Sequence, residues 1–482
     1  MSKFDAERNL TMLTDFYEIT MANGYFKNGF KDTVAYFDMF FRKVPDNGGF
    51  AIMAGVEQLV EYLRNLSFTK EDIDYLRGKG FGEEFLDYLA NFKFACDVYA
   101  IPEGTPIFPG EPIIKVKGPV IQAQFIETMV LICINHQSLI ATKANRIVRA
   151  ADGRAVMEFG SRRAHGWDGA IYGARAAYIG GCVGTACTIS DEAFGTPALG
   201  TMAHSWIQLF DTEYDAFKAY ALEYPDACTL LVDTYNVLKS GVPNAIKVFD
   251  EVLKPLGKRP KGIRIDSGDI TYLSRKARKM LDEAGYEDCA IVASNSLDEI
   301  IIRDMLLQGA QIDSFGVGER LVTSSSSPVF GGVYKIVAVE KDGKVIPKIK
   351  ISENVQKITT PGNKRLYRFY DKDTGKAIAD LIALSDEVID PAKPYVLFDP
   401  VYTWKQKKVT NFEVRELLEP IFVKGECVYK PRETKEIRDF CKQQIDTLWD
   451  EVLRFEYPHN YYVDLSEKLW NMKHTLLAEN RG

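Results

Sequence analysis

The chain has 482 residues, more than one ordinary hydrophobic core, so we expect two or three domains. Its composition, 46% hydrophobic, 26% charged and 12% aromatic, is that of a globular protein and excludes extensive disorder. The net charge of -7 argues against a nucleic-acid partner, because such proteins neutralise phosphates with clustered Lys and Arg.

The first 140 residues show a mixed helix and strand pattern. Their start, MSKFDAERNL, is charged and lacks the apolar segment of a signal peptide. Apolar spacing predicts helices around Leu59–Leu63 and Phe85–Leu89, whereas Val98–Val116 holds short β runs broken by Pro and Gly. The apolar window Phe125–Thr142 is interrupted by polar residues, so we expect no membrane span.

Seven short apolar runs follow, each ending in small or polar residues before a helical stretch. The runs are Ala155–Phe159, Cys182–Thr188, Leu199–Ala203, Leu230–Val232, Gly262–Ile265, Ala290–Ala293 and Ile312–Phe315. Their spacing of roughly 20 to 33 residues fits βα units, because parallel strands need a crossover helix. About seven units favour a closed TIM-like barrel, and a doubly wound open sheet is the alternative.

The last third returns to strands and then to helix. The runs GVYKIVAVE and VIPKIKIS flank a turn at Asp342-Gly343, and apolar residues from Ile437 to Val452 follow helix spacing. The sequence therefore predicts an α/β protein in three parts. These are an N-terminal α+β sandwich at 1–140 completed by 331–400, an irregular TIM-like β/α barrel carrying the catalytic site at 141–330, and a mostly helical region at 401–482.

The eight cysteines form no zinc-binding pattern, since none stands in a C-x-x-C pair. Several lie inside apolar runs, where cysteine is usually a small core residue. We expect reduced thiols, which suit the cytosol, and no structural zinc.

The segment Arg264-Ile265-Asp266-Ser267-Gly268-Asp269 stands where a predicted strand meets a helix. Asp266 could accept two hydrogen bonds from ribose hydroxyls, and the free N–H groups of the next helix suit an anion. The alternative is an ordinary helix N-cap. Arg264 points the same way along the strand as Asp266, which favours a paired site.

Other strand ends carry further candidates. Phe159 could stack on a flat heterocycle, and Arg162 could hold phosphate or carboxylate in a fork, or else pair with a structural acid. Gly316 and Gly318 begin a glycine- and hydroxyl-rich segment of the kind that binds phosphate late in a barrel. An isolated histidine such as His204 is usually structural, but at a strand end it is a candidate phosphate acceptor or acid–base group.

Seven motifs, in order, resemble the nicotinate phosphoribosyltransferase family. They are TDFYE (14–18), EFGSRRAHG (158–166), GTMAHS (200–205), GIRIDSGD (262–269), FGVGERLVT (315–323), GGVYK (331–335) and KITTPGNK (357–364). One such motif would be weak evidence, but seven in order from about Thr11 to about Val428 are highly specific.

The resemblance implies a reaction of nicotinate with phosphoribosyl pyrophosphate, coupled to ATP hydrolysis, that yields nicotinate mononucleotide and pyrophosphate in NAD biosynthesis. It also implies the glycosyltransferase and ligase classes, Mg²⁺ and ATP as co-substrate. The protein would be a cytoplasmic homodimer with shared active sites, without a nucleic-acid or membrane partner.

The resemblance also implies residue roles. Tyr17 of the partner subunit and Phe159 would lie on opposite faces of the pyridine ring, and Thr201 and Arg264 would contact nicotinate. His204 would be the phosphohistidine, and Asp266 and Arg264 would be catalytic. Phosphoribosyl pyrophosphate would be surrounded by Arg162, Asp266, Gly316, Gly318, Thr323 and Lys364. Arg42 and Lys43 resemble, more loosely, basic residues that reach the pyrophosphate in the related nicotinamide enzyme.

One position helps to choose the base. Met202 stands where the related nicotinamide enzymes carry an aspartate, and it cannot accept a hydrogen bond from a carboxamide well. The nearest alternatives are nicotinamide or quinolinate phosphoribosyltransferases. A barrel lyase or aldolase would need a lysine at a strand end, and none stands there. A ligand-binding or signalling protein on the same scaffold would not need Arg264, Asp266 and His204, which are all present.

Overall fold

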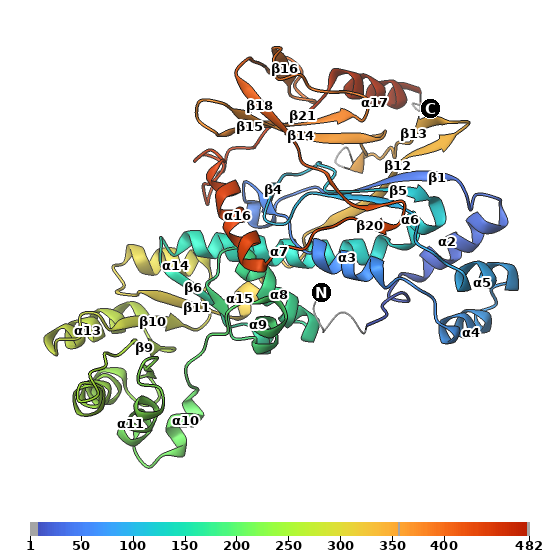
Figure 1. Cartoon of the computed structure of the whole chain (residues 1–482). Coiled ribbons are helices and arrows are strands. Elements are labelled where there is room, and N and C mark those ends of the chain that lie inside the picture. Colours follow the sequence, from blue (N-terminus) through green and yellow to red (C-terminus); the bar gives the residue numbers. More distant parts are fainter. Residues whose placement is uncertain (1–7, 355–356, 480–482) are drawn as a thin grey trace. The chain divides into compact units, whose positions relative to one another are not determined.

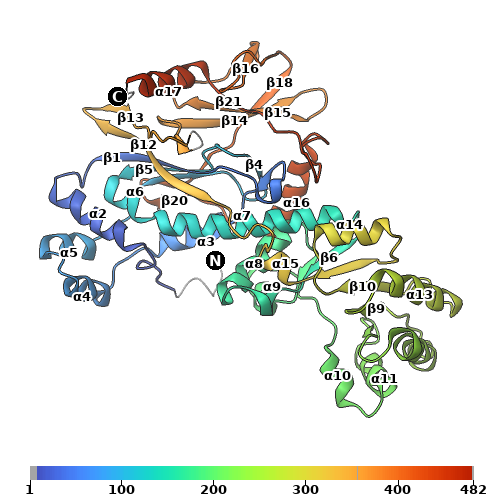
Figure 2. The ribbon, with the colours of Figure 1, turned by 180° about the vertical axis from the view of Figure 1, so that it is seen from behind.

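The computed structural model describes residues 8–354 and 357–479 (Figures 1 and 2). The chain forms two compact units. Unit 1 comprises Met1–Thr142 and Val329–Gly482, and unit 2 comprises Lys143–Pro328. Unit 2 has almost the same bounds as the barrel domain predicted at 141–330. The two units are described separately below.

A seven-stranded sheet forms the first layer of unit 1. In spatial order its strands are β13 (Lys344–Pro347), β12 (Gly332–Lys341), β1 (Val34–Phe41), β5 (Ile114–Pro119), β3 (Asp97–Ala100), β19 (Glu419–Val423) and β20 (Glu426–Cys427). All neighbours are antiparallel, and β12 follows unit 2 in sequence yet pairs with β1. Strands after unit 2 thus complete the N-terminal sheet, as predicted.

Helices accompany this sheet in unit 1. They are α2 (Phe16–Lys27), α3 (Val56–Arg64), α4 (Lys70–Gly78), α5 (Glu83–Ala90), α6 (Val120–Phe125) and α7 (Glu127–Ala150). Helices α3 and α5 confirm the two that apolar spacing predicted, because that spacing places their apolar residues on one buried face. A short pair, β2 (Ala51–Ile52) and β4 (Pro106–Ile107), completes the N-terminal part.

A four-stranded sheet forms a second layer of unit 1, above the first in Figures 1 and 2. Its order is β18 (Phe412–Glu416), β14 (Lys364–Asp371), β15 (Ala377–Leu384) and β21 (Val463–Leu465). Every residue of β15 is buried, and Phe369, Leu381 and Phe412 share its core with Leu397 and Val409. Those two belong to the hairpin of β16 (Tyr395–Phe398) and β17 (Gln406–Val409).

The prediction of a mostly helical region at 401–482 is wrong. This stretch holds five strands, β17 to β21, beside the helices α16 (Thr434–Asp446) and α17 (Glu467–Glu479). The strands are short and many of their side chains are charged and exposed, so apolar alternation does not reveal them. Only α16 carries the apolar stripe that was visible in the sequence.

Unit 2 is built on a six-stranded parallel sheet with the order β7-β6-β11-β10-β9-β8. The strands are β6 (Ala155–Glu158), β7 (Gly184–Thr185), β8 (Thr229–Leu231), β9 (Gly262–Ile265), β10 (Ala290–Ser294) and β11 (Ser314–Val317). The main crossover helices are α8 (Trp167–Ile179), α11 (Glu213–Glu223), α13 (Ile270–Glu283) and α14 (Glu299–Leu307).

Six of the seven predicted strands are present, and Leu199–Ala203 is the exception. This run is a loop, and its neighbour Ala198 makes only an isolated bridge to Thr185. The last strand, β11, pairs with the first, β6, which is the closure that a barrel requires. Among the described residues β7 and β8 are the unpaired edges of this sheet, so the predicted closed barrel is not confirmed.

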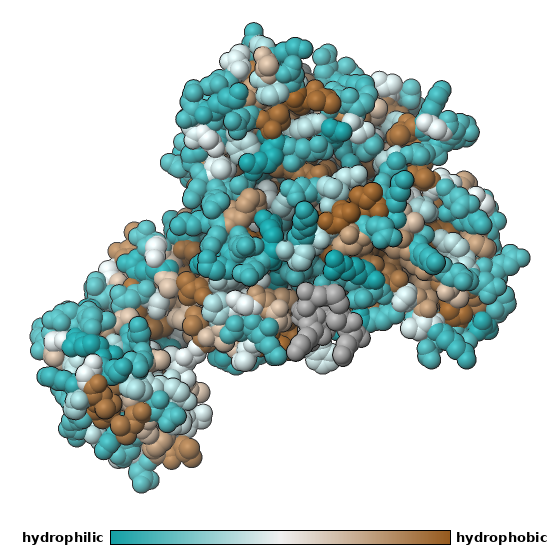
Figure 3. All heavy atoms as spheres, in the orientation of Figure 1, coloured by the Kyte–Doolittle hydropathy of each residue, from teal (hydrophilic) through white to brown (hydrophobic). Residues whose placement is uncertain are grey.

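The apolar helical stretch Val120–Ala150 would be long enough to cross a membrane if judged by length and composition alone. However, 72% of its most apolar window is buried inside the structure, as in a core helix. Seven of the eight cysteines are buried, which confirms their interpretation as core residues. Hydrophilic residues predominate on the face shown in Figure 3.

Candidate active site

Arg264 occupies the third position of β9 and reaches the loop that replaces the missing strand. Its Nη1 donates to Thr201 Oγ1 and its Nη2 donates to the Met202 carbonyl, both at 3.0 Å. Burial lowers the pKa of this guanidinium, Asp266 and Asp233 oppose that effect, and Arg162 adds to it. Its buried Nε has no acceptor among the described residues. Arg264 therefore keeps a buried donor for an anionic ligand.

Asp266 follows β9 directly, beside a second carboxylate, Asp233, that comes two residues after β8. Asp233 Oδ2 accepts from the Asp266 backbone N–H at 3.2 Å and from Ser267 Oγ at 2.5 Å. Ser294, the last residue of β10, donates its hydroxyl to Asp266 Oδ1. The other oxygen of Asp233 is buried without a partner in the described part of the chain. Three adjacent strands thus bring two carboxylates together at one sheet edge.

His204 begins the short helix α10 (His204–Leu209) and faces the same two strand ends. Its Nδ1 lies 3.0 Å from Thr234 Oγ1, just after β8, and its Nε2 lies 3.8 Å from Asp266 Oδ2. The side chains of His204 and Asp266 are 40% and 36% exposed, so a ligand can reach both. A solvent-accessible imidazole beside a carboxylate is suited to accept a phosphoryl group.

Phe159 follows β6 and is held by its glycine neighbours. A Cβ on Gly316 would lie 2.5 Å from the Phe159 ring, and a Cβ on Gly318 would lie 3.1 Å from the Phe159 carbonyl. Glu158 is buried and accepts from Thr185 Oγ1 at 2.6 Å and from the Gly160 N–H. The glycines therefore position the aromatic ring, a role that the sequence did not indicate. Their predicted contact with phosphate stays a prediction.

Arg162 and Thr323 lie at the same end of the sheet. Arg162 is exposed in the 3-10 turn Ser161–Arg163 after β6, and its charge lowers the pKa of Arg264, after the larger effect of burial. Thr323 ends α15 (Glu319–Val322) and donates its hydroxyl to the Glu319 carbonyl at 2.7 Å. Both residues follow strands, β6 and β11, that are hydrogen-bonded neighbours.

Two predicted ligand residues, Tyr17 and Lys364, belong to unit 1. Tyr17 stands on α2 with 45% of its surface exposed, so its ring is available for stacking. Lys364 is 1% exposed, and its ammonium group lies within 2.8 Å of three acceptors in unit 1, namely Asp38 Oδ2 and the carbonyls of Thr360 and Gly362. An ammonium group has three N–H donors, so contact with a phosphate would displace one of these acceptors.

Lys364 lines a cavity of about 250 Å³ in unit 1 together with Arg42 and Lys473. Burial lowers the pKa of Lys473, and the charge of Lys364 lowers it further. Three basic groups around one cavity favour an anionic ligand. Lys43, the other loosely matched residue, lines a different cavity with Arg42.

Sequence reasoning did not assign a site role to Asp233, Thr234, Ser294 or Glu158. The signal was present, since all four stand at or just after strand ends that the apolar runs had located. A further signal exists only in the structure. Asn295 and Ser296, directly after β10, have φ values of 95° and 49°. Such backbone conformations are unfavourable for residues other than glycine and cluster at functional sites.

Comparison with known proteins covers nearly the whole chain. Residues 12–135, 154–377 and 363–473 match the models of the N-terminal domain, the family and the C-terminal domain of nicotinate phosphoribosyltransferase. The nicotinate phosphoribosyltransferase of Bacillus subtilis is 45% identical over 468 residues, 96% of this chain and 94% of that protein. Nicotinate phosphoribosyltransferase pncB2 of Mycobacterium tuberculosis is 39% identical, covering 95% of this chain and 92% of that protein.

A solved structure agrees. The crystal structure of human nicotinic acid phosphoribosyltransferase superposes with a TM-score of 0.83 at 28% identity. The match covers 96% of this chain and 100% of that one.

Proposed function

This chain belongs to the nicotinate phosphoribosyltransferase family, and from that premise we propose how its own residues perform the reaction. The chain is an enzyme that joins nicotinate to the ribose 5-phosphate of phosphoribosyl pyrophosphate, in NAD biosynthesis. The observation that supports the residue roles is the convergence of Thr201, His204, Arg264 and Asp266 at the end of β9.

Arg264 and Thr201 hold the carboxylate of nicotinate. The hydrogen bonds to Thr201 and Met202 fix the plane of the guanidinium, and the unpaired Nε–H remains available to the ligand. The pyridine ring stacks on Phe159. In this position the pyridine nitrogen points at C1 of the ribose. Met202 offers its carbonyl to Arg264 rather than a side-chain acceptor to the base, which favours nicotinate over nicotinamide.

Asp266 binds the ribose hydroxyls and Arg162 binds phosphate. Pyrophosphate leaves as the pyridine nitrogen attacks, through a transition state with positive charge on the sugar ring. The carboxylates of Asp266 and Asp233 lie where they can stabilise that charge. The backbone N–H groups around Gly316 and Gly318, with the Thr323 hydroxyl, bind the 5-phosphate.

The donor set also fits Mg²⁺. The oxygens of Asp233 and Asp266 are hard ligands, and one buried oxygen of Asp233 lacks a partner among the described residues. These two residues would hold the ion together with oxygens of the substrate. When bound, Mg²⁺ would neutralise the charge that develops on the leaving pyrophosphate.

His204 couples ATP to the reaction. A ring nitrogen attacks the terminal phosphorus of ATP, the bond to the bridging oxygen breaks, and ADP leaves. The phosphorylated ring then lies beside Asp266, because Nε2 of His204 is 3.8 Å from Asp266 Oδ2. New negative charge at that position changes how the site binds phosphoribosyl pyrophosphate, and hydrolysis resets it.

The enzyme is a cytoplasmic homodimer with shared sites. Tyr17 of one subunit stacks on the pyridine ring bound by the partner, and the basic cavity with Arg42 and Lys364 receives the pyrophosphate end. The sheet of unit 2 is proposed to be an irregular barrel, which the pairing of β11 with β6 supports, although β7 and β8 are its unpaired edges among the described residues.

A product assay tests the proposal. The protein is supplied with phosphoribosyl pyrophosphate, Mg²⁺ and labelled nicotinate, nicotinamide or quinolinate, with and without ATP. We expect labelled mononucleotide from nicotinate, more of it with ATP, and ADP in step with the product. Turnover of either other base at an equal rate would refute the assignment of the base. Product formation unaffected by ATP would refute the coupling.

A further inference from the structure

A second large cavity of unit 1 contains a buried acid that the reaction does not use. This cavity, about 1140 Å³, lies between the turn after β16 and the segment that leads into β21. Its wall includes two carboxylates, Asp399 and Asp464, and several aromatic residues. The aromatic residues are Phe108, Tyr402, Tyr457, His459, Tyr461 and Tyr462. We name it the β21 cavity.

Asp464 is the central residue of β21 and is 5% exposed. Within the described residues its carboxyl group has no hydrogen bond and no ion pair. Burial raises its pKa to about 7, and the neighbouring carboxyl of Asp399 adds to the rise. A carboxylate buried in this way is costly unless something compensates its charge. The residues that the structure describes do not supply that partner.

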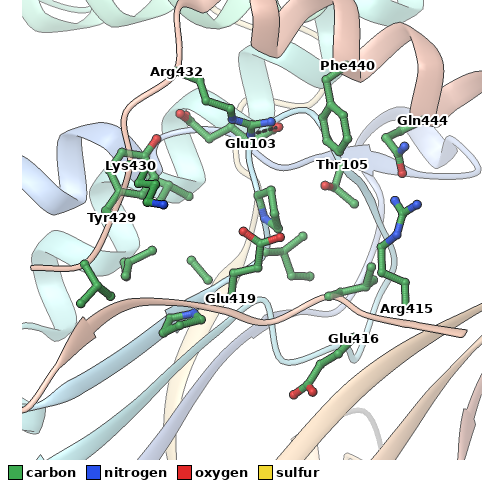
Figure 4. Close-up of a pocket in the computed structure, with 18 residues that line it drawn as sticks. Glu103, Thr105, Arg415, Glu416, Glu419, Tyr429, Lys430, Arg432, Phe440 and Gln444 are labelled. Atoms are coloured by element: carbon green, nitrogen blue, oxygen red, sulfur yellow. Dashed lines mark hydrogen bonds between the residues drawn. The ribbon is translucent and has the colours of Figure 1, made fainter. Parts of the chain in front are cut away.

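Other buried charges in unit 1 show what compensation looks like. Asp380 accepts two hydrogen bonds from Arg368. The cavity of Figure 4 also differs from the β21 cavity, because its Arg432 and its buried Glu103 both have partners. There Arg432 donates to the Glu103 carbonyl at 3.2 Å and lies over the Phe440 ring, and Glu103 Oε1 accepts from a backbone N–H at 2.6 Å. Asp464 has no such partner in the described part of the chain.

The walls of the β21 cavity favour an organic cation over a metal ion. No group of three metal-ligating side chains occurs among the residues that the structure describes. Asp399 Oδ1 already accepts from the N–H groups of Val401 and Tyr402, at 2.8 and 2.7 Å. The Tyr402 ring already faces a cation, because the Lys405 ammonium lies 4.5 Å from its centre. Carboxylates beside aromatic faces are the combination that binds ammonium and ring-nitrogen cations.

Basic residues also line the cavity, and they define the rest of the ligand. They are Arg42, Lys43, Lys405 and Arg454. Lys43 and Lys405 are exposed, and Arg454 has an ion pair with Glu451 at 3.9 Å. Exposed lysines would repel a simple cation only weakly. If the ligand carried a negative group beside its cationic nitrogen, these lysines would attract that group.

We propose that the β21 cavity binds a small molecule with a positively charged nitrogen, which Asp464 and Asp399 hold against the tyrosine rings. An anionic group on the same molecule is held by the exposed lysines. The cavity shares Arg42 and Lys43 with the residues placed near the pyrophosphate, but Asp464 and Asp399 have no part in the transferase reaction, so the proposal goes beyond that activity.

Calorimetric titration of the full chain tests this site. The probes are tetramethylammonium, 1-methylnicotinamide and choline phosphate, with MgCl₂ and KCl as inorganic arms and nicotinate present to occupy the active site. We expect saturable binding of at least one organic probe, weakened tenfold or more in Asp464→Asn. A stronger signal from choline phosphate than from tetramethylammonium supports the role of the lysines.

Two further variants keep the test decisive. Asp373→Asn, an exposed acid in the same unit outside the cavity, should bind as the original chain does. Tyr402→Ala should weaken binding of the organic probes. Because Tyr402 is 47% exposed, this variant should fold even if Asp464→Asn does not. Absence of saturable binding, equal binding by Asp464→Asn and the original chain, or saturation by Mg²⁺ or K⁺ alone would overturn the proposal.

Discussion

Each unit contains an arginine and an aspartate that lie close together, Arg368 and Asp380 in unit 1 and Arg264 and Asp266 in unit 2, and the two sets have different roles. In unit 1, Arg368 and Asp380 face each other across β14 and β15, are fully buried, and share two hydrogen bonds of 2.8 and 2.7 Å. Tyr461 donates a third to Asp380 at 3.0 Å. In unit 2, Asp266 accepts one side-chain hydrogen bond within the described residues and its side chain is 36% exposed. Among those residues each arginine has one buried nitrogen without an acceptor, Arg264 Nε and Arg368 Nη1, so the two sets differ in the pairing and exposure of their carboxylates.

The difference separates a structural set from a binding set. The carboxylate of Asp380 has its partners within the fold, so the fold depends on it. Burial lowers the pKa of Arg368, but Asp380 outweighs burial and the pKa is raised, so the arginine stays charged. Asp266 and Arg264 keep unused hydrogen-bonding capacity at an accessible sheet edge. We therefore expect loss of stability from changes in the first set and loss of activity from changes in the second.

The largest effect should come from Arg368→Ala. The change leaves Asp380 buried without its cation and should lower the free energy of unfolding by about 3–5 kcal/mol. Urea unfolding measures it. The control is Arg365→Ala, on the same strand. The ion pair of Arg365 with Glu416 is exposed and 3.6 Å long, so this substitution should cost less than about 1 kcal/mol of stability. Equal effects of the two variants would contradict the comparison.

Asp266→Ala should lower kcat/KM by about 100-fold or more, equivalent to about 2.7 kcal/mol, while the melting temperature stays the same. Steady-state kinetics with phosphoribosyl pyrophosphate as the varied substrate measure the loss. Asp269→Ala is the matched control, because Asp269 caps α13 through the Tyr272 N–H at 2.9 Å. It should cost about 1 kcal/mol of stability with little loss of activity. A loss below tenfold for Asp266→Ala would remove its role at the ribose.

Glu18, a buried acid of unit 1, should make stability depend on pH. Burial raises its pKa from 4.5 to about 7, although hydrogen bonds from Thr14 and Thr128 oppose the rise. Since the pKa is higher in the folded state, the stabilisation is complete below about pH 4.5 and is lost as the pH rises through 7. The free energy of unfolding of the original chain, relative to that of Glu18→Gln, should therefore fall by ~2 kcal/mol between pH 4.5 and 8.

Urea unfolding of both proteins across this range measures the difference. A constant difference between them would show that Glu18 does not titrate there.

The smallest effect on the basal reaction should come from His204→Ala. We expect a low rate that no longer responds to ATP, because the phosphoryl acceptor is gone. Rates with and without ATP, and acid-labile labelling by ATP, measure this. His165→Ala provides a control histidine, exposed after the 3-10 turn in unit 2. Retained ATP stimulation in His204→Ala would exclude the phosphohistidine.

Much of the fold followed from local patterns. The runs at Gly262–Ile265 and Ala290–Ala293 became β9 and β10, since buried parallel strands are short and apolar throughout. Leu199–Ala203 has the same composition but is a loop. Apolar residues alone do not decide between strand and loop, which depends on whether a neighbouring strand is there to pair. The strands after 401 were missed for the opposite reason, because pairing forms them despite their polar side chains.

The sequence by itself determined the family, the reaction and the residues at the strand ends, because motif order and strand spacing are local properties of the chain. Only the tertiary structure decided which residues keep hydrogen-bond donors or acceptors without a partner. It showed Asp233 and Ser294 beside Asp266, Gly316 against the Phe159 ring, Lys364 paired with Asp38, and Asp464 without a partner among the described residues. The reason is physical: a partner is supplied by whichever distant segment packs against the residue, and sequence spacing does not contain that information.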